Sequence, residues 1–168
     1  MMKQSLLFNA LLLITSLTIG CAHGNIKSLD GQSSVDGKIS RVSVTIEGVV
    51  PDRLQVYQSL DGNSLIERDV TAAVRAAGRY DAGGDVELKI VVTNFRLRST
   101  GNAFWAGIYG GVDKLGGNVE FRSAGASPQS YSFALSGSED WLFKFDRVDR
   151  LDSLARLLGK KVVSTLKK

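Results

Sequence analysis

The only cysteine and the only histidine of this chain, Cys21 and His23, stand two positions apart in the stretch LTIGCAHGN. A thiolate and an imidazole are both good zinc ligands, but a tetrahedral site takes four protein ligands, or three and a water. The chain has no further cysteine or histidine to complete such a site. We therefore expect no metal and no cofactor, with His23 as an exposed residue of a linker, and another role for the Cys21 thiol.

The segment before Cys21 has the order of a secretory signal. MMKQS carries one lysine, and LLFNALLLITSLTIG then forms a mostly apolar run of 15 residues. This run is shorter than the ~20 residues with which a helix crosses the hydrocarbon core of a bilayer. We predict a signal peptide over residues 1–20; a short uncleaved anchor is the alternative.

Thr18, Ile19 and Gly20 immediately precede Cys21. This order resembles the lipobox of bacterial lipoproteins, although Thr18 occupies the usual aliphatic position and Leu17 stands one place earlier. The resemblance implies that the thiol accepts a diacylglyceryl group and that cleavage frees an amine for a third acyl chain. Each buried methylene contributes about 0.8 kcal/mol, so two or three chains hold a protein firmly. Ala22 replaces the aspartate that retains lipoproteins in the inner membrane, which implies the outer membrane, facing the periplasm.

Residues 22–38, AHGNIKSLDGQSSVDGK, are rich in Gly, Ser, Asn and Asp and show no sustained apolar period. This composition is typical of a flexible tether. We therefore expect a signal peptide (1–20), a lipidated cysteine with its tether (21–38) and one folded domain (39–168). The chain is 43 % hydrophobic and 23 % charged with a net charge of +4, which fits a globular domain. Its basic residues are scattered, so we expect no nucleic-acid partner.

The domain offers few groups for catalysis, because a serine nucleophile needs a base that is most often histidine. Glu139 and Asp140 in LSGSEDWLFKF are the best candidates for an acid and a base. Neighbouring strand residues point to opposite faces, so we interpret them as surface charge and expect no catalytic residue. Asp81 and Asp85 flank the glycines of DAGGD, but calcium takes 6–8 oxygens, which favours a turn over a cation site.

Phe104, Trp105, Ile108 and Tyr109 stand among glycines in TGNAFWAGIYGGVDKLGG. This segment lacks the GxxxxGK[ST] order of a phosphate-binding loop. Large side chains in such a segment either cover an open face of the sheet or form an exposed patch that contacts a protein or a membrane. We keep both interpretations and name these four residues as a candidate interface.

Strand and helix signals alternate from residue 39 onward. ISRVSVTIEG (39–48) alternates apolar and polar residues and predicts a strand, and RLQVYQSL (53–60) is expected to add a short extended piece. Ser64 and Glu67 have the spacing of a capping box. The apolar stripe that follows predicts a helix, which Gly78 ends.

The second half of the chain predicts a long strand, a hairpin and a helix. Residues 85–99 are expected to form a strand whose apolar phase changes near Thr93 or Asn94, which indicates either a bulge or a central strand covered on both faces. GNVEFRS (117–123) and YSFALSGS (131–138) pair as a hairpin. A helix begins near Asp146 or Asp149. Its expected buried stripe comprises Val148, Leu151, Ala155, Leu158, Val162 and Leu166.

The elements follow the order β-α-β-β-β-α. We predict an α+β domain in which two helices pack on one face of a mostly antiparallel sheet of about four strands. With the lipobox-like start, this layout resembles small bacterial lipoproteins of unknown function and is similar to periplasmic accessory lipoproteins. The resemblance implies a lipid-anchored, non-catalytic binding or assembly module, with the membrane and another envelope protein as partners. An envelope-acting hydrolase that uses carboxylates and a purely structural lipoprotein are the alternatives.

Overall fold

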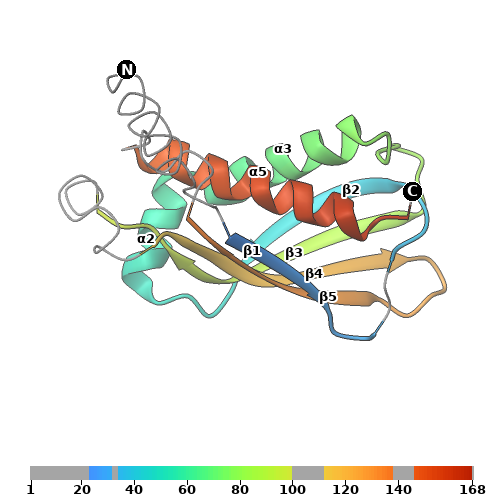
Figure 1. Ribbon diagram of the computed structural model, residues 1–168, viewed down its shortest axis with the longest axis horizontal. Helices are drawn as coiled ribbons and strands as arrows, with labels where there is room; N and C mark the ends of the chain where they lie inside the picture. Colours follow the sequence, from blue (N-terminus) through green and yellow to red (C-terminus); the bar gives the residue numbers. More distant parts are fainter. Residues whose placement is uncertain (1–22, 32–33, 100–111, 138–145, 168) are drawn as a thin grey trace, which may run out of the picture.

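The computed structural model describes residues 23–31, 34–99, 112–137 and 146–167. In these segments five strands form one sheet in the order β1-β5-β4-β3-β2, accompanied by three helices (Figure 1). The strands are β1 (His23–Ser28), β2 (Ile39–Ile46), β3 (Val86–Arg96), β4 (Lys114–Ser123) and β5 (Gln129–Ser136). The helices are α2 (Pro51–Ser59), α3 (Gly62–Ala76) and α5 (Arg147–Thr165). The α+β class is confirmed, but the order is β-β-α-α-β-β-β-α, with one strand and one helix more than expected.

The sheet is mixed. β2 and β3 pair in parallel, whereas the other three pairings are antiparallel. Parallel neighbours need a crossover connection, and here the chain passes through α2 and α3 between the two strands. Figure 1 shows α3 and α5 side by side over the same face of the sheet.

β1 corrects the prediction of a flexible tether. His23–Ser28 pairs antiparallel with β5 and forms an edge of the sheet. Further along, Val35 is 2 % exposed, and its main-chain N–H donates to the carbonyl oxygen of Thr165 at 2.8 Å. The tether prediction failed because β1 has a single large apolar residue, Ile26, and is stabilised mainly by main-chain pairing. The described residues before position 39 therefore belong to the fold.

α2 corrects the prediction of a short extended piece at residues 53–60. Pro51 occupies the first turn, where its fixed φ suits a helix and its missing N–H is not needed. Tyr57 is 1 % exposed, and its ring stacks edge-on against Phe95 with 5.0 Å between centroids. Tyr57 is the buried residue of α2, so the helix lacks the apolar stripe by which a helix is predicted from sequence.

The core lies between the sheet and the two long helices. α3 buries Leu65, Ile66, Val70 and Val74, and α5 buries a longer set that includes Leu151, Leu154, Ala155, Leu158 and Val162. The helices approach closely at Gly159, where a Cβ would lie 2.7 Å from the Cβ of Ala73. Glycine at this point therefore sets the spacing of the helical layer. Within the described segments, no helix is both long and apolar enough to cross a bilayer.

The predicted helix boundaries and the bulge are largely confirmed. Gly78 has φ +67°, the left-handed conformation expected after α3, and Asp146 caps α5 by accepting from the Val148 N–H at 2.7 Å. The register of β3 against β4 shifts between Val92 and Asn94. The capping box was wrong, because α3 begins at Gly62 and Ser64 Oγ donates to Asp61 Oδ1 instead.

Val148 was also assigned wrongly, because it is 45 % exposed rather than part of the buried stripe of α5. It lies in the first turn of the helix. The remaining five residues of the predicted stripe are buried: Leu151, Ala155, Leu158, Val162 and Leu166.

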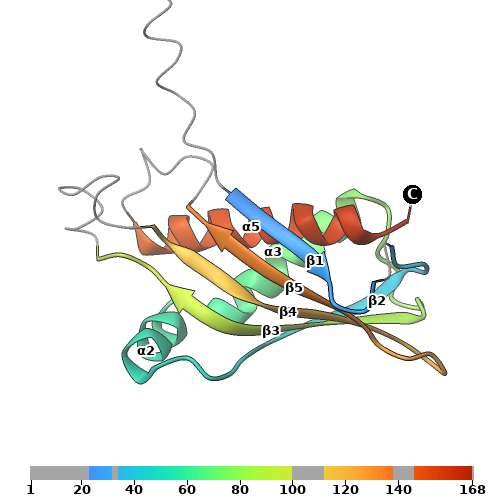
Figure 2. The same ribbon diagram turned by 60° about the horizontal axis from the view of Figure 1, so that its bottom comes forward.

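The face of the sheet opposite α3 and α5, hereafter the open face, has no described helix across it (Figure 2). α2 does not cover it, since Tyr57 packs against Phe95, which lies on the helix side opposite buried Leu115. The open face is therefore left uncovered by the described helices.

Candidate functional site

The cross-strand register shows which side chains share the open face at one end of the sheet. Directly opposite residues of paired strands lie on the same face. At this end β3 and β5 finish, while β4 and β1 begin. The first two rows are Arg96–Lys114–Ser136–His23 and Asn94–Gly116–Ala134–Asn25. Each row therefore brings together residues from four strands that lie far apart in the sequence.

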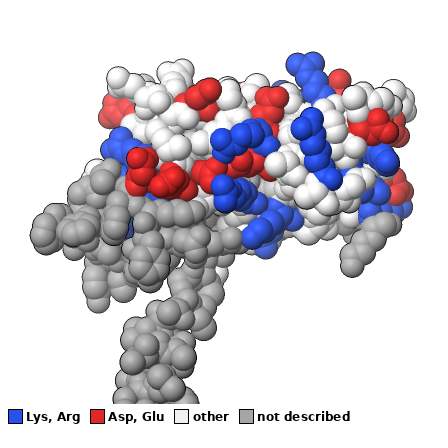
Figure 3. Space-filling model, turned by 90° about the horizontal axis from the view of Figure 1, so that it is seen from above, with Lys and Arg blue, Asp and Glu red and all other residues white. Residues whose placement is uncertain are grey.

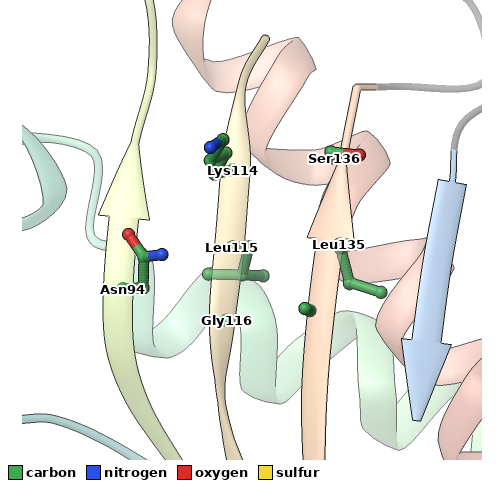
Figure 4. Close-up of a pocket in the computed structure, with 7 residues that line it drawn as sticks. Asn94, Lys114, Leu115, Gly116, Leu135 and Ser136 are labelled. Atoms are coloured by element: carbon green, nitrogen blue, oxygen red, sulfur yellow. The ribbon is translucent and has the colours of Figure 1, made fainter.

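A hollow of about 290 Å³ lies in these two rows. Gly116 and Ala134 are opposite one another and leave its floor low. Asn94, Lys114 and Ser136 stand around it on three neighbouring strands (Figure 4). The hollow exists because two adjacent open-face positions carry almost no side chain.

The end of the open face that holds the hollow is basic. Arg96 and Lys114 lie in the first row, and Lys27 follows in the third row, opposite Ser132. The strand positions in these three rows carry no carboxylate. Arg96, Lys114 and Lys27 are all exposed; together with the hollow they are called the basic end below.

The opposite end of the open face carries both signs of charge. Lys89 faces Glu120, and Glu87 faces Arg122. Arg122 also donates to Glu120 through Nε at 3.1 Å and Nη2 at 2.5 Å. Positive charge without a facing carboxylate is therefore confined, among the described strand residues, to the basic end.

The hollow presents several hydrogen-bond donors. Lys114 offers an ammonium, Asn94 an amide NH2 and Ser136 a hydroxyl. Ser136 Oγ donates to the main-chain oxygen of His23 at 3.5 Å, and its cross-strand neighbours in the first row are Lys114 and His23. This donor set suits the binding of an anionic group.

A buried ion cluster supports this end of the sheet. Asp113, directly before β4, is 1 % exposed and accepts from Nη1 of Arg150 on α5 at 2.9 and 3.1 Å. Arg150 Nη2 donates to the main-chain oxygen of Arg98 at 2.8 Å, and the Arg98 main-chain N–H donates to Asp113 Oδ1 at 2.8 Å. The cluster thus ties the residues just after β3 and just before β4 to the first turns of α5. It holds the strand ends that carry Arg96 and Lys114.

Two acidic residues, Asp69 of α3 and Asp152 of α5, meet on the helix side of the sheet, and neither was a candidate from the sequence. Arg68 Nε lies 2.8 Å from Asp69 Oδ1 and its Nη2 lies 2.5 Å from Asp152 Oδ1, and Arg156 joins Asp152 at 2.8 Å. Burial raises the pKa of Asp69; the Arg68 hydrogen bond opposes this rise, and the nearby Asp152 adds to it. The pair could not be foreseen, because its members lie on different helices 83 positions apart.

The acid pair borders a groove between α3 and α5 of about 590 Å³. Small side chains of α3 floor the groove, and Arg156 and Lys160 of α5 also line it. Figure 3, which looks onto this side, shows basic and acidic side chains interleaved with uncharged surface between them. Neither sign of charge dominates this surface. Because Arg68 of α3 pairs with Asp152 of α5, we interpret the acid pair as part of the contact between the two helices.

Most of the site residues predicted from the sequence lie outside the described residues. These are Cys21, Phe104, Trp105, Ile108, Tyr109, Glu139 and Asp140. His23 begins β1 and is exposed, so it belongs to a strand rather than a linker. Asp81 and Asp85 both accept main-chain hydrogen bonds: Asp81 from the nearby Gly83 N–H at 3.0 Å, and Asp85 from the Lys38 N–H at 3.2 Å, 47 positions away in the sequence. In the described segments, no three His, Cys, Asp or Glu side chains gather as metal ligands would.

No protein-family model and no curated protein matches the sequence. Solved structures similar to the chain include a PelC dodecamer from Paraburkholderia phytofirmans, with a TM-score of 0.51, 16 % identity, and 87 % of this chain and 100 % of that chain covered. A point variant of the same dodecamer gives a TM-score of 0.52 with the same identity and coverage. At this identity the similarity shows the fold alone.

Proposed function

We propose that this chain is a lipid-anchored, non-catalytic binding or assembly module of the bacterial cell envelope. In this proposal acyl chains on Cys21 hold it to the outer membrane, and the domain faces the periplasm. The observation that carries the proposal is β1, an edge strand that begins two residues after Cys21. An anchor at Cys21 would join the sheet almost directly and keep the domain close to the bilayer.

The likeness to PelC supports an assembly role. The similar structures are described as dodecamers, and the present fold has two edge strands, β1 and β2, that can meet neighbouring chains. We therefore propose that this chain acts with other copies of itself or with another envelope protein. Phe104, Trp105, Ile108 and Tyr109 stay the predicted contact residues.

Acylation is tested by the mass of the mature protein purified from a bacterial host that processes lipoproteins. We expect the mature chain to begin at Cys21 and to carry a diacylglyceryl group and a third acyl chain. Cys21→Ser should abolish labelling by radioactive palmitate, whereas the matched variant His23→Ser should be labelled normally. A mature chain that begins elsewhere with a bare thiol would refute the anchor.

Assembly is tested separately by sedimentation of the acylated protein in an uncharged detergent. We expect a mass that is a multiple of the protomer mass, or co-purification with one envelope protein that is lost on Trp105→Ala. If both the unmodified chain and Trp105→Ala sediment as monomers and co-purify with no envelope protein, the assembly role would be excluded and a purely structural lipoprotein would remain.

An envelope-acting hydrolase is the second candidate. Its predicted acids, Glu139 and Asp140, lie outside the described residues, but the raised pKa of Asp69 beside Asp152 is an observation in its favour, because a carboxyl whose pKa is raised by burial can act as a general acid. If isolated envelopes released soluble fragments on treatment with the protein, and Asp69→Asn stopped the release, the non-catalytic proposal would fail.

A further inference from the structure

The basic end of the open face has no function in the fold. Arg96, Lys114 and Lys27 are exposed, and no described carboxylate forms an ion pair with them. Other basic side chains of the domain do form ion pairs, as in Arg68 with two aspartates and Lys167 with Asp36. Asp113, directly before Lys114, is 1 % exposed and is paired with Arg150; Glu47 follows β2, on the far side of β3. One cation, Lys114, thus lines a hollow that also offers an amide and a hydroxyl, and Arg96 and Lys27 lie in the first and third rows of the same end.

The chemistry of the hollow matches a phosphate. A phosphate group accepts several hydrogen bonds and carries charge, so an ammonium, an amide NH2 and a hydroxyl around one recess complement it. The low floor at Gly116 and Ala134 lets a group of this size approach the sheet. Arg96 stands beside Lys114 in the first row and adds a second cation.

The position of the basic end in the chain indicates the source of the phosphate. Lys114, Ser136 and His23 lie in one row on β4, β5 and β1, so Lys114 is two strand spacings, about 10 Å, from His23. Cys21 is two residues before His23, which adds at most about 7 Å of chain. The hollow is therefore within about 17 Å of Cys21, the residue that would carry the acyl chains.

We propose that the basic end binds the phosphate of an anionic lipid headgroup in the leaflet that holds the acyl chains. The placement beside the bilayer rests on the proposed function, whereas the recognition chemistry does not. With the headgroup bound, the end of the sheet that carries Arg96 and Lys114 would face the membrane, and the mixed-charge end would point away from it.

Binding can be measured on the full acylated chain in an uncharged detergent, by following the amide NMR signals of Gly116 and Ala134. The probe is dihexanoyl phosphatidylglycerol, with dihexanoyl phosphatidylcholine and inorganic phosphate as separate arms. We expect phosphatidylglycerol to shift both amides saturably and the other two probes to bind at least ten-fold more weakly. Each Lys or Arg near an anionic lipid contributes about 1 kcal/mol, or roughly five-fold in affinity. The double variant Arg96→Gln/Lys114→Gln should therefore bind roughly twenty-five-fold more weakly.

The matched control removes the same charge from the other end of the same face. Lys89→Gln/Arg122→Gln should bind phosphatidylglycerol as the unmodified chain does, and both double variants should keep dispersed amide spectra because all four positions are at least partly exposed. Equal binding of the two lipids, unshifted amides, or equal loss in both double variants would overturn the proposal. Inorganic phosphate that binds as tightly as phosphatidylglycerol would overturn the lipid source and indicate a free-phosphate site. The mass of the mature chain reports acylation independently, so an acylated chain that ignores phosphatidylglycerol refutes this inference alone.

Discussion

Nη1 of Arg150 lies 2.9 Å and 3.1 Å from the two carboxylate oxygens of Asp113, and the side chains of both residues are at most 1 % exposed. Buried charges are tolerated only when they are paired and hydrogen-bonded. This pair joins α5 to the start of β4, so a helix and a strand that are 37 positions apart at the contact are held in one arrangement.

Arg150→Met should lower the free energy of unfolding by about 3–5 kcal/mol, because it leaves the Asp113 carboxylate buried without its main partner. Urea denaturation followed by circular dichroism measures the loss. Arg156→Met is the matched control, since the Arg156 side chain is 63 % exposed and an exposed pair contributes about 0–1 kcal/mol. Similar losses in the two variants would show that burial does not govern the strength of the Arg150 pair.

Gly159→Ala should destabilise the domain by about 1–3 kcal/mol, as overpacking does in a dense core. The new methyl group would lie 2.7 Å from the Cβ of Ala73 and would push α3 and α5 apart. Adding Ala73→Gly should return part of the loss, so thermal melts of the single and double variants give the coupling directly. Gly83→Ala serves as the control, because its nearest neighbour would be an Asp81 oxygen at 3.6 Å. If the stability changes of Gly159→Ala and Ala73→Gly simply add in the double variant, the close approach of the two helices at these positions would be contradicted.

The raised pKa of Asp69 predicts a pH dependence of stability. The folded chain holds a proton on this carboxyl more tightly than the unfolded chain does, so stability falls as pH rises from the unfolded pKa through the folded pKa. Asp69→Asn cannot ionise and should lack this fall. We therefore expect the variant to lose more stability relative to the unmodified chain at acidic pH than at neutral pH, in urea melts across that range. A difference between Asp69→Asn and the unmodified chain that does not change with pH would refute the argument.

Asp146→Ala should cost about 0.5–2 kcal/mol, the usual value of a helix N-cap. The carboxylate accepts from the Val148 N–H at 2.7 Å and its main-chain oxygen accepts from Arg150 Nε at 3.3 Å. Asp146→Ser keeps an acceptor and should recover most of the loss in the same denaturation assay. If serine and alanine behave alike, the side-chain cap contributes nothing.

The elements with strong local signals were predictable from the sequence. The phase change in β3 predicted the bulge between Val92 and Asn94, and Asp146 was named as a start of the last helix. Two elements escaped prediction because their stability comes from elsewhere in the chain. β1 depends on pairing with β5, more than 100 positions away, and α2 packs on the core through Tyr57, whose ring contacts Phe95 of β3, with Val56 beside it.

The basic end of the open face was not predictable for a related reason. Its cations come from three strands and look scattered along the chain, since only the register places Arg96 beside Lys114 and relates both to Lys27. Cross-strand register depends on turns, bulges and pairing partners that one sequence does not reveal. The hollow needs two further coincidences, Gly116 opposite Ala134 and both on the open face.

The pairing of β1 has a mechanical consequence. The chain enters this strand at His23 and runs antiparallel to β5 over six paired positions. A force applied along the strand axis to the chain ahead of His23 would load these hydrogen bonds together in shear, rather than opening them one after another as in peeling. A pulling force from the amino-terminal side would thus be shared among the hydrogen bonds between β1 and β5, and it would be carried by the sheet rather than by the helices.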